Sequence, residues 1–183
     1  MIEKTAPPPV EGLVHIYCGN GKGKTSAALG LGLRACGRGF RVLLVRFLKD
    51  EHSGELNALK EFDCFTVLKT PKTLPFTWKM SEKEKADYAS YAKGMFEDAL
   101  FAVENNGYDM LILDEACAAA AYGMLDKNAV TTFLKTRPSS LEVVLTGRNP
   151  PEEWVELADY VSQIQCIKHP FEQGIRERAG IEY

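Results

Sequence analysis

The chain has 183 residues, of which 45% are hydrophobic and 26% are charged, a composition typical of one globular domain with an apolar core. It carries 22 Lys and Arg residues against 25 Asp and Glu residues, so its formal net charge is −3. Proteins that hold nucleic acid through its phosphates usually have a basic excess, and a membrane helix needs roughly 20 apolar residues in a row. The sequence has neither feature, so we expect no nucleic-acid partner and no membrane partner.

Residues 1–12 precede the first apolar run and include three consecutive prolines at positions 7–9. Proline is not accommodated in the interior of a helix, and the segment lacks the apolar stretch of a secretory signal. We therefore expect residues 1–12 to form an extended arm that leads into a single domain over residues 13–183.

Short apolar runs alternate with helix-forming segments along that domain. Strands are expected at residues 13–17, 41–48, 64–68, 110–113, 141–145 and 160–166, and helices at residues 25–36, 81–105, 126–135 and 152–157. Ser81 and Glu84 have the spacing of a capping box, Asp126 is suited to cap the next helix, and Gly107 is a stop signal. Strands that alternate with helices predict an α/β fold, with a mostly parallel central sheet and helices on both faces.

Residues 69–79 form the one long irregular segment, and they include Phe76 and Trp78. Long loops in compact domains tend to carry function. From the residues alone, however, ordinary packing of the two aromatic side chains is the simpler interpretation.

Five cysteines, at positions 18, 36, 64, 117 and 166, are widely spaced and include no C-x-x-C pair. An odd, scattered set argues against a disulfide framework and against a zinc ribbon. We expect the cysteines to be small buried side chains in a protein of the reducing cytoplasm.

A glycine-rich loop lies between the first expected strand and the first expected helix, and it reads Gly19-Asn20-Gly21-Lys22-Gly23-Lys24-Thr25-Ser26. Successive backbone N–H groups and a helix N-terminus attract phosphate, Lys24 adds a positive charge, and the Thr25 hydroxyl can bind Mg²⁺. The usual pattern is G-x-x-x-x-G-K-[ST], whereas here position 18 is Cys18 and the first glycine comes one place later. The loop predicts a site for a nucleoside triphosphate, and specifically ATP.

Polar side chains follow two further strands at the carboxyl edge of the predicted sheet. Asp114 and Glu115 end one strand, where phosphate-loop proteins place a carboxylate near the metal ion. Arg148 follows the next strand, where it either faces phosphate or forms a structural ion pair. Kinases, ATPases and nucleotidyl or alkyl transferases share these features, as does a non-catalytic nucleotide- or nucleic-acid-binding module.

The chain resembles the ATP-dependent corrinoid adenosyltransferases of the phosphate-loop type, also called the CobA/BtuR type, from Leu13 to its C-terminus. Besides the glycine-rich loop, the resemblance rests on Arg34, Phe76-Thr77-Trp78, Leu113-Asp114-Glu115, Leu145-Thr146-Gly147-Arg148, and the tail Lys168-His169-Pro170-Phe171 with Gly174, Gly180-Ile181 and Tyr183.

This resemblance implies a RecA-like phosphate-loop domain, a homodimer, and an enzyme that transfers the 5′-deoxyadenosyl group of ATP to the cobalt(I) of a reduced corrinoid. Triphosphate leaves, and the product belongs to adenosylcobalamin synthesis or salvage. The corrinoid is cobalamin or a precursor, a choice that the sequence leaves open. A flavoprotein is the implied reductant.

The resemblance also assigns residues. Lys24 is expected to be catalytic, and Thr25, Asp114 and Glu115 are expected to hold Mg²⁺. Phe76 and Trp78 are expected to contact the corrinoid and to displace the lower axial ligand of cobalt(II), which eases its reduction. ATP is expected to bind Gly19, Asn20, Gly21, Lys22, Gly23, Lys24, Thr25, Ser26 and Arg34.

Some family members carry a longer N-terminal helix that closes over the site. Because only residues 1–12 precede the first expected strand, and because they include three prolines, we do not expect such a helical lid here. We expect no catalytic role for His15 or His169.

Overall fold

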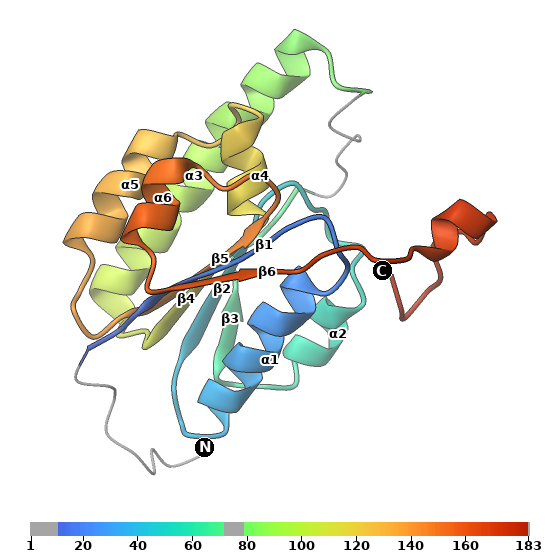
Figure 1. Cartoon of the computed structure of the whole chain (residues 1–183). Helices are drawn as coiled ribbons and strands as arrows, with labels where there is room; N and C mark the ends of the chain where they lie inside the picture. The colour runs from blue at the N-terminus through green and yellow to red at the C-terminus, as the bar shows by residue number, and fades with distance from the viewer. Residues whose placement is uncertain (1–10, 72–78, 183) are drawn as a thin grey trace.

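The computed structural model describes residues 11–71 and 79–182, and its centre is a six-stranded sheet (Figure 1). The strands are β1 (Val14–Cys18), β2 (Val42–Arg46), β3 (Phe65–Val67), β4 (Met110–Asp114), β5 (Glu142–Gly147) and β6 (Tyr160–Gln163). They lie in the order β3-β2-β4-β5-β1-β6, and each pairing is parallel. The carboxyl ends of all the strands therefore lie along one edge, where ligands of such sheets bind.

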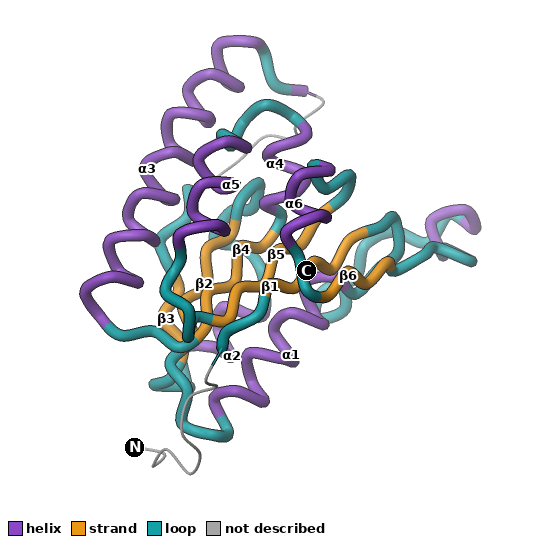
Figure 2. Tube along the Cα trace, turned by 60° about the vertical axis from the view of Figure 1, so that its left-hand side comes forward, coloured by secondary structure: helices purple, strands orange, loops and turns teal. Residues whose placement is uncertain are grey.

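Helices cover both faces of this sheet (Figures 1 and 2). One face carries α1 (Lys24–Cys36) and α2 (Glu55–Leu59), and the other carries α3 (Glu82–Asn106), α4 (Ala116–Ala121), α5 (Lys127–Thr136) and α6 (Glu152–Leu157). β2 and β4 are buried along their whole length because they are covered from both sides. The expected α/β fold, with a parallel sheet between two helical layers, is confirmed.

Each face of the sheet has its own apolar core. On the α3–α6 face, Trp154 of α6 is fully buried in one cluster with Leu111 of β4. On the α1–α2 face, Ala28 of α1 packs in a second cluster with Ile112 of β4. The alternation of neighbouring β4 residues between the two clusters follows from the two-residue period of a strand.

The predicted helix ends are confirmed. Ser81 Oγ accepts a hydrogen bond from the backbone N–H of Glu84 at 3.3 Å, and Ser81 N donates to Glu84 Oε2 at 2.7 Å, which completes the capping box. Gly107 ends α3 with φ 65°, a left-handed conformation that favours glycine. Asp126 caps α5 by accepting from the backbone N–H of Asn128 at 2.8 Å.

Sequence reasoning missed three short elements: α2, α4 and the 3₁₀ helix η2 (Pro170–Gln173). α4 is an alanine-rich segment of six residues that begins directly after Glu115, with no side-chain cap to mark its start. Such short helices depend on tertiary packing rather than on a pattern of their own. The last strand also ends at Gln163, three residues earlier than predicted.

The expectation for the cysteines is wrong at one pair. Cys36, at the end of α1, and Cys64, just before β3, form a disulfide with their Cα atoms 5.7 Å apart. The packing of α1 on the β2–β3 side of the sheet brings these positions together across 28 residues of sequence. Cys18 and Cys117 are free and buried as expected, whereas Cys166 is only partly buried.

Two expectations concern residues that the structure does not describe. Most of the N-terminal arm falls within residues 1–10, and both Phe76 and Trp78 fall within residues 72–78. In the described part of the chain, no helix is long and apolar enough to cross a membrane.

Candidate active site

The glycine-rich loop connects the carboxyl end of β1 to the first turn of α1. Gly19 (φ 105°) and Gly23 (φ 113°) have left-handed backbone conformations that other residues rarely adopt. A Cβ atom on Gly19 would also lie 2.3 Å from the carbonyl oxygen of Ile164. Because α1 starts at Lys24, its free N–H groups and positive dipole end adjoin the loop. This backbone suits the phosphate-binding role that the sequence predicts for the loop.

Lys24 is folded back onto this loop. Its side chain is buried, and Nζ donates a hydrogen bond to the carbonyl oxygen of Gly21 at 2.9 Å. Burial lowers the pKa of Lys24, the carboxylate of Glu115 opposes that shift, and the positive charge of Arg148 adds to it. An anion in the loop would be a stronger partner for this ammonium than a neutral carbonyl oxygen.

Asp114, at the end of β4, is the centre of a buried polar cluster. Its Oδ1 accepts hydrogen bonds from Thr25 Oγ1 at 2.8 Å and from Thr146 Oγ1 at 2.7 Å. Its Oδ2 accepts no aligned hydrogen bond, although the Lys49 ammonium lies 2.7 Å away in an ion pair. The fold thus joins the phosphate loop, β4 and β5 through one carboxylate.

Glu115 adjoins the same cluster in a left-handed backbone conformation, with φ 58°. Its backbone N–H donates to Thr146 Oγ1 at 2.9 Å. The pKa of Glu115 is raised, mainly by burial and to a smaller extent by the negative charge of Asp114. The cations Lys49, Lys24 and Arg148 oppose that rise. A strained backbone at an acidic residue beside a phosphate loop is typical of a functional position.

Lys49 is a member of the cluster that sequence reasoning missed. Nζ lies 3.0 Å from Thr25 Oγ1 as well as 2.7 Å from Asp114 Oδ2. The signal that could have found it is its position three residues after β2, at the carboxyl edge where the other site residues also lie.

The two arginines considered from the sequence lie in different places. Arg148 follows β5 at the carboxyl edge and is exposed, and its charge acts on both Lys24 and Glu115. Arg34 is in the last turn of α1, ten positions after Lys24, so about 15 Å of helix separates it from the loop. Within one chain, the fold brings Arg148 to the site but does not bring Arg34 there.

The segment that follows β6 runs alongside the phosphate loop, a contact that sequence reasoning did not predict. The backbone N–H of Gly21 donates to the carbonyl oxygen of Ile164, and that of Cys166 donates to Asn20 Oδ1, each at 2.9 Å. Near the C-terminus, Glu182 Oε1 accepts from Lys22 Nζ at 2.9 Å. The side chains of Asn20 and Lys22 thus hold the tail rather than point freely toward a ligand.

Comparison with known proteins agrees with this geometry. A family model described as ATP:corrinoid adenosyltransferase BtuR/CobO/CobP matches residues 10–183. The chain belongs to this family. It is 36% identical to the corrinoid adenosyltransferase of Escherichia coli strain K12, over 94% of the chain and 86% of that protein. It is also 36% identical to the corrinoid adenosyltransferase CobA of Salmonella typhimurium and 31% identical to that of Pseudomonas aeruginosa, again over 94% of the chain and over 86% and 84% of those proteins.

In this adenosyltransferase the oxygen atoms at the loop fit Mg²⁺, a hard cation that prefers carboxylate and hydroxyl oxygens. The candidate ligand atoms are Thr25 Oγ1, which lies 2.8 Å from Asp114 Oδ1, and Asp114 Oδ2, which is buried and accepts no aligned hydrogen bond. Among the described residues, no group of three or more His, Cys, Asp or Glu side chains forms a metal cage. Mg²⁺ usually takes its remaining ligands from phosphates and water, so this partial donor set suits it.

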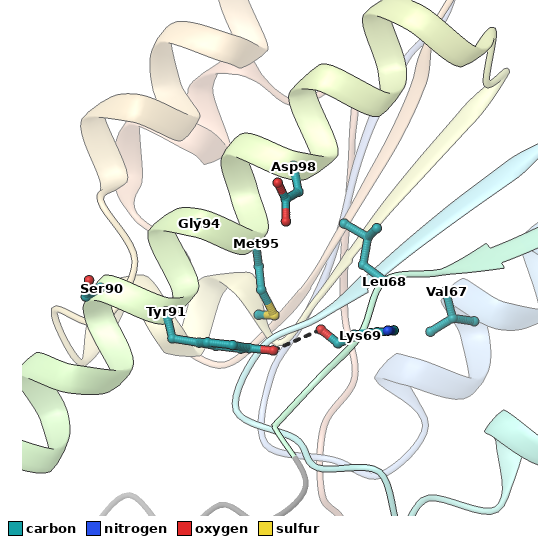
Figure 3. A pocket seen from close by; sticks show the side chains of 8 residues that line it. All are labelled: Val67, Leu68, Lys69, Ser90, Tyr91, Gly94, Met95 and Asp98. Atoms are coloured by element: carbon teal, nitrogen blue, oxygen red, sulfur yellow. Dashed lines mark hydrogen bonds between the residues drawn. The ribbon is translucent and has the colours of Figure 1, made fainter.

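A separate pocket of about 650 Å³ lies between α3 and the carboxyl end of β3 in the adenosyltransferase (Figure 3). Tyr91 crosses it and donates a hydrogen bond to the carbonyl oxygen of Lys69 at 3.1 Å. β3 and β1 are four strand spacings apart, about 19 Å. The pocket is therefore distinct from the phosphate loop. Its lining residues are Val67, Leu68, Lys69, Ser90, Tyr91, Gly94, Met95 and Asp98.

Proposed function

We propose that this protein transfers the 5′-deoxyadenosyl group of ATP to the cobalt(I) of a reduced corrinoid and releases triphosphate. The observation that carries the proposal is the match of residues 10–183 to the ATP:corrinoid adenosyltransferase family. A phosphate loop whose Thr25 is hydrogen-bonded to Asp114 at the carboxyl edge of the sheet supports the ATP half of the reaction.

The chemistry explains why the site needs no protein nucleophile. The cobalt(I) electron pair forms the bond to the 5′ carbon, the bond from that carbon to oxygen breaks, and its electrons leave with the triphosphate. The chain has to orient the carbon and stabilise negative charge on the leaving group. Lys24 donates to the carbonyl oxygen of Gly21, and the proposal is that it donates to a phosphate oxygen of bound ATP instead.

We propose Mg²⁺ as the accompanying metal, held by Thr25 and Asp114. When bound, it would neutralise part of the triphosphate charge. The positive charges of Lys49 and Lys24 act on Glu115 and favour its ionised form. This supports a place for its carboxylate near the metal rather than the role of a base. For ATP itself, the proposed contacts are residues 19–26. Arg34 is no longer among them, because about 15 Å of α1 separates it from the loop.

The corrinoid contacts proposed for Phe76 and Trp78 rest on the resemblance of the Phe-Thr-Trp triplet to the family. A broad apolar ring requires apolar contact surface, and aromatic side chains provide it. Displacement of the lower axial ligand by these side chains would favour the reduction that produces cobalt(I).

We also propose a homodimer and a flavoprotein reductant. Exposed apolar side chains on the edge strand β6 and on the tail support a protein interface: Tyr160, Val161, Ile167, Phe171, Ile175 and Ile181. Unpaired strand edges and clustered apolar side chains are frequent sites of association. A single peak at the monomer mass in sedimentation velocity, at micromolar protein concentration, would contradict the dimer.

We place the reaction in the cytoplasm, where ATP and reducing equivalents are available. The disulfide between Cys36 and Cys64 counts against this location, because such bonds are rare in that compartment.

The test is an assay with ATP, Mg²⁺ and chemically reduced cobalamin. We expect the absorbance change of cobalt–carbon bond formation together with release of triphosphate. Release of ADP or orthophosphate without adenosylcobalamin would instead favour a kinase or another nucleoside triphosphatase. If no product forms at all, the remaining hypothesis is a non-catalytic binding module.

A further inference from the structure

Lys49 contacts both of the oxygen-bearing side chains that would hold Mg²⁺. Its ammonium is 3.0 Å from Thr25 Oγ1, to which it donates a hydrogen bond, and 2.7 Å from Asp114 Oδ2. Asp114 is fully buried, whereas the side chain of Lys49 is 23% exposed. A buried carboxylate needs a counter-charge, and Lys49 is the cation in contact with it.

The loop after β2 is built so that Lys49 reaches this place. Leu48 has a left-handed backbone with φ 54°, and its N–H donates to the hydroxyl oxygen of the buried Tyr88 at 2.6 Å. On the other side, the buried guanidinium of Arg46 donates to the carbonyl oxygen of Asp50 at 3.2 Å and to Ser53 Oγ. The backbone on both sides of Lys49 is therefore fixed, while the end of its own side chain remains the movable part.

The ammonium of Lys49 and Mg²⁺ cannot both contact Thr25 Oγ1 and Asp114 Oδ2 at the same time. Mg²⁺ binds oxygen at about 2.0–2.1 Å in near-octahedral geometry, and a second cation in contact with the same two oxygens would be repelled. Metal binding at Thr25 and Asp114 therefore requires Lys49 to leave. A lysine side chain is long and flexible enough to do so without any movement of the backbone.

We propose that Lys49 is an exchangeable counter-ion. In the protein without nucleotide it neutralises Asp114, and when ATP and Mg²⁺ bind it transfers from Asp114 to the triphosphate. This inference rests on the proposed ATP site. Because Lys49 opposes the metal before nucleotide arrives and binds the nucleotide afterwards, it couples the two binding events, and that coupling is reciprocal.

The first test measures Mn²⁺, as a paramagnetic substitute for Mg²⁺, by electron paramagnetic resonance on the full chain without nucleotide. Lys49→Gln is expected to bind Mn²⁺ about two- to fivefold more tightly than wild type, the effect of one partly exposed charge. Lys60→Gln is the matched control, because Lys60 is an exposed lysine at the end of α2 whose Nζ is 3.5 Å from Asn57 Oδ1. It should bind Mn²⁺ as wild type does.

The second test measures ATP binding by calorimetry in the presence of EDTA. Lys49→Gln should bind metal-free ATP at least about threefold more weakly than wild type and Lys60→Gln, because one phosphate contact is lost. Unchanged Mn²⁺ affinity in Lys49→Gln overturns the exchange, and unchanged metal-free ATP affinity overturns the transfer to triphosphate.

Two further variants keep the test decisive. Lys49→Arg retains the charge and should bind Mn²⁺ nearly as weakly as wild type; tight binding equal to that of Lys49→Gln would refute the role of charge. Lys49→Met removes the charge but keeps the apolar stem, and it replaces Lys49→Gln if that variant does not fold. None of these measurements includes a corrinoid, so their failure is distinct from failure of adenosyl transfer.

Discussion

At the scale of single residues, the charged side chains of the site have partners within the chain itself. Lys24 donates to its own loop, and Asp114 is neutralised by Lys49. Each of these cations has a weaker or replaceable partner, so binding of a triphosphate exchanges contacts rather than creating them from nothing. Preorganised cations of this kind stabilise a leaving group with little rearrangement.

Lys24→Ala should weaken ATP binding by about 10- to 100-fold, the effect of losing a hydrogen bond from a charged group, and should abolish adenosyl transfer. Calorimetry with ATP and Mg²⁺ checks the affinity, and the cobalamin assay checks the transfer. Lys60→Ala serves as the exposed control. Transfer by Lys24→Ala at close to the wild-type rate would show that the loop is not the ATP site.

Trp78→Ala should spare turnover with pre-reduced cobalt(I) and damage turnover that starts from cobalt(II), because its proposed role lies in the reduction step. Two assays with the same variant, one from each oxidation state, separate these cases. Equal losses in both would mean that Trp78 has a structural role instead.

At the scale of elements, the helix caps and the disulfide between the end of α1 and the residue just before β3 contribute to local stability. The caps of α3 and α5 use side chains that a sequence pattern identifies. The Cys36–Cys64 disulfide depends instead on how α1 packs beside β2 and β3.

Asp126→Ala should lower the free energy of unfolding by about 1 kcal/mol, because α5 loses its N-cap acceptor for the N–H groups of Asn128 and Ala129. Urea denaturation of the variant and wild type measures the difference. Asp126→Asn, which retains the side-chain oxygen, should recover most of it. A loss equal to that of alanine would contradict the capping role.

Cys64→Ala should lower the free energy of unfolding by about 2–4 kcal/mol in buffer without reductant, because the cross-link no longer restricts the unfolded chain. Denaturation with and without dithiothreitol provides the measurement. With reductant the gap to wild type should shrink, and Cys166→Ala should have little effect in either buffer. The same gap in both buffers would exclude the disulfide as its cause.

At the scale of the whole molecule, the chain returns to its own phosphate loop after β6. The backbone of residues 164–166 lies against Asn20 and Gly21, although about 145 positions separate them. That approach is possible because these loop positions include glycines: a Cβ atom on Gly21 would lie 2.8 Å from the carbonyl oxygen of Gln165.

Gly21→Ala should therefore push the tail from the loop and lower the free energy of unfolding by about 1–3 kcal/mol. Gly30→Ala is the matched control, because no atom lies within 4 Å of its added Cβ, and alanine in a helix should be neutral or stabilising. Urea denaturation compares the two, and hydrogen exchange at residues 164–166 reports on the tail. Equal stability of the two variants would contradict the close approach.

The sequence by itself determined the alternation of strands and helices, the helix caps, the phosphate loop and the position of Asp114 and Glu115. Each of these depends on local requirements: apolar periodicity, a capping side chain, or glycine where the backbone is left-handed. Only the tertiary structure decided that Lys49 neutralises Asp114, that Cys36 joins Cys64, that the tail lies against the loop and that Arg34 lies about 15 Å along α1 from that loop. Those are contacts between distant segments, set by strand order and helix packing, and no pattern along the chain encodes them separately.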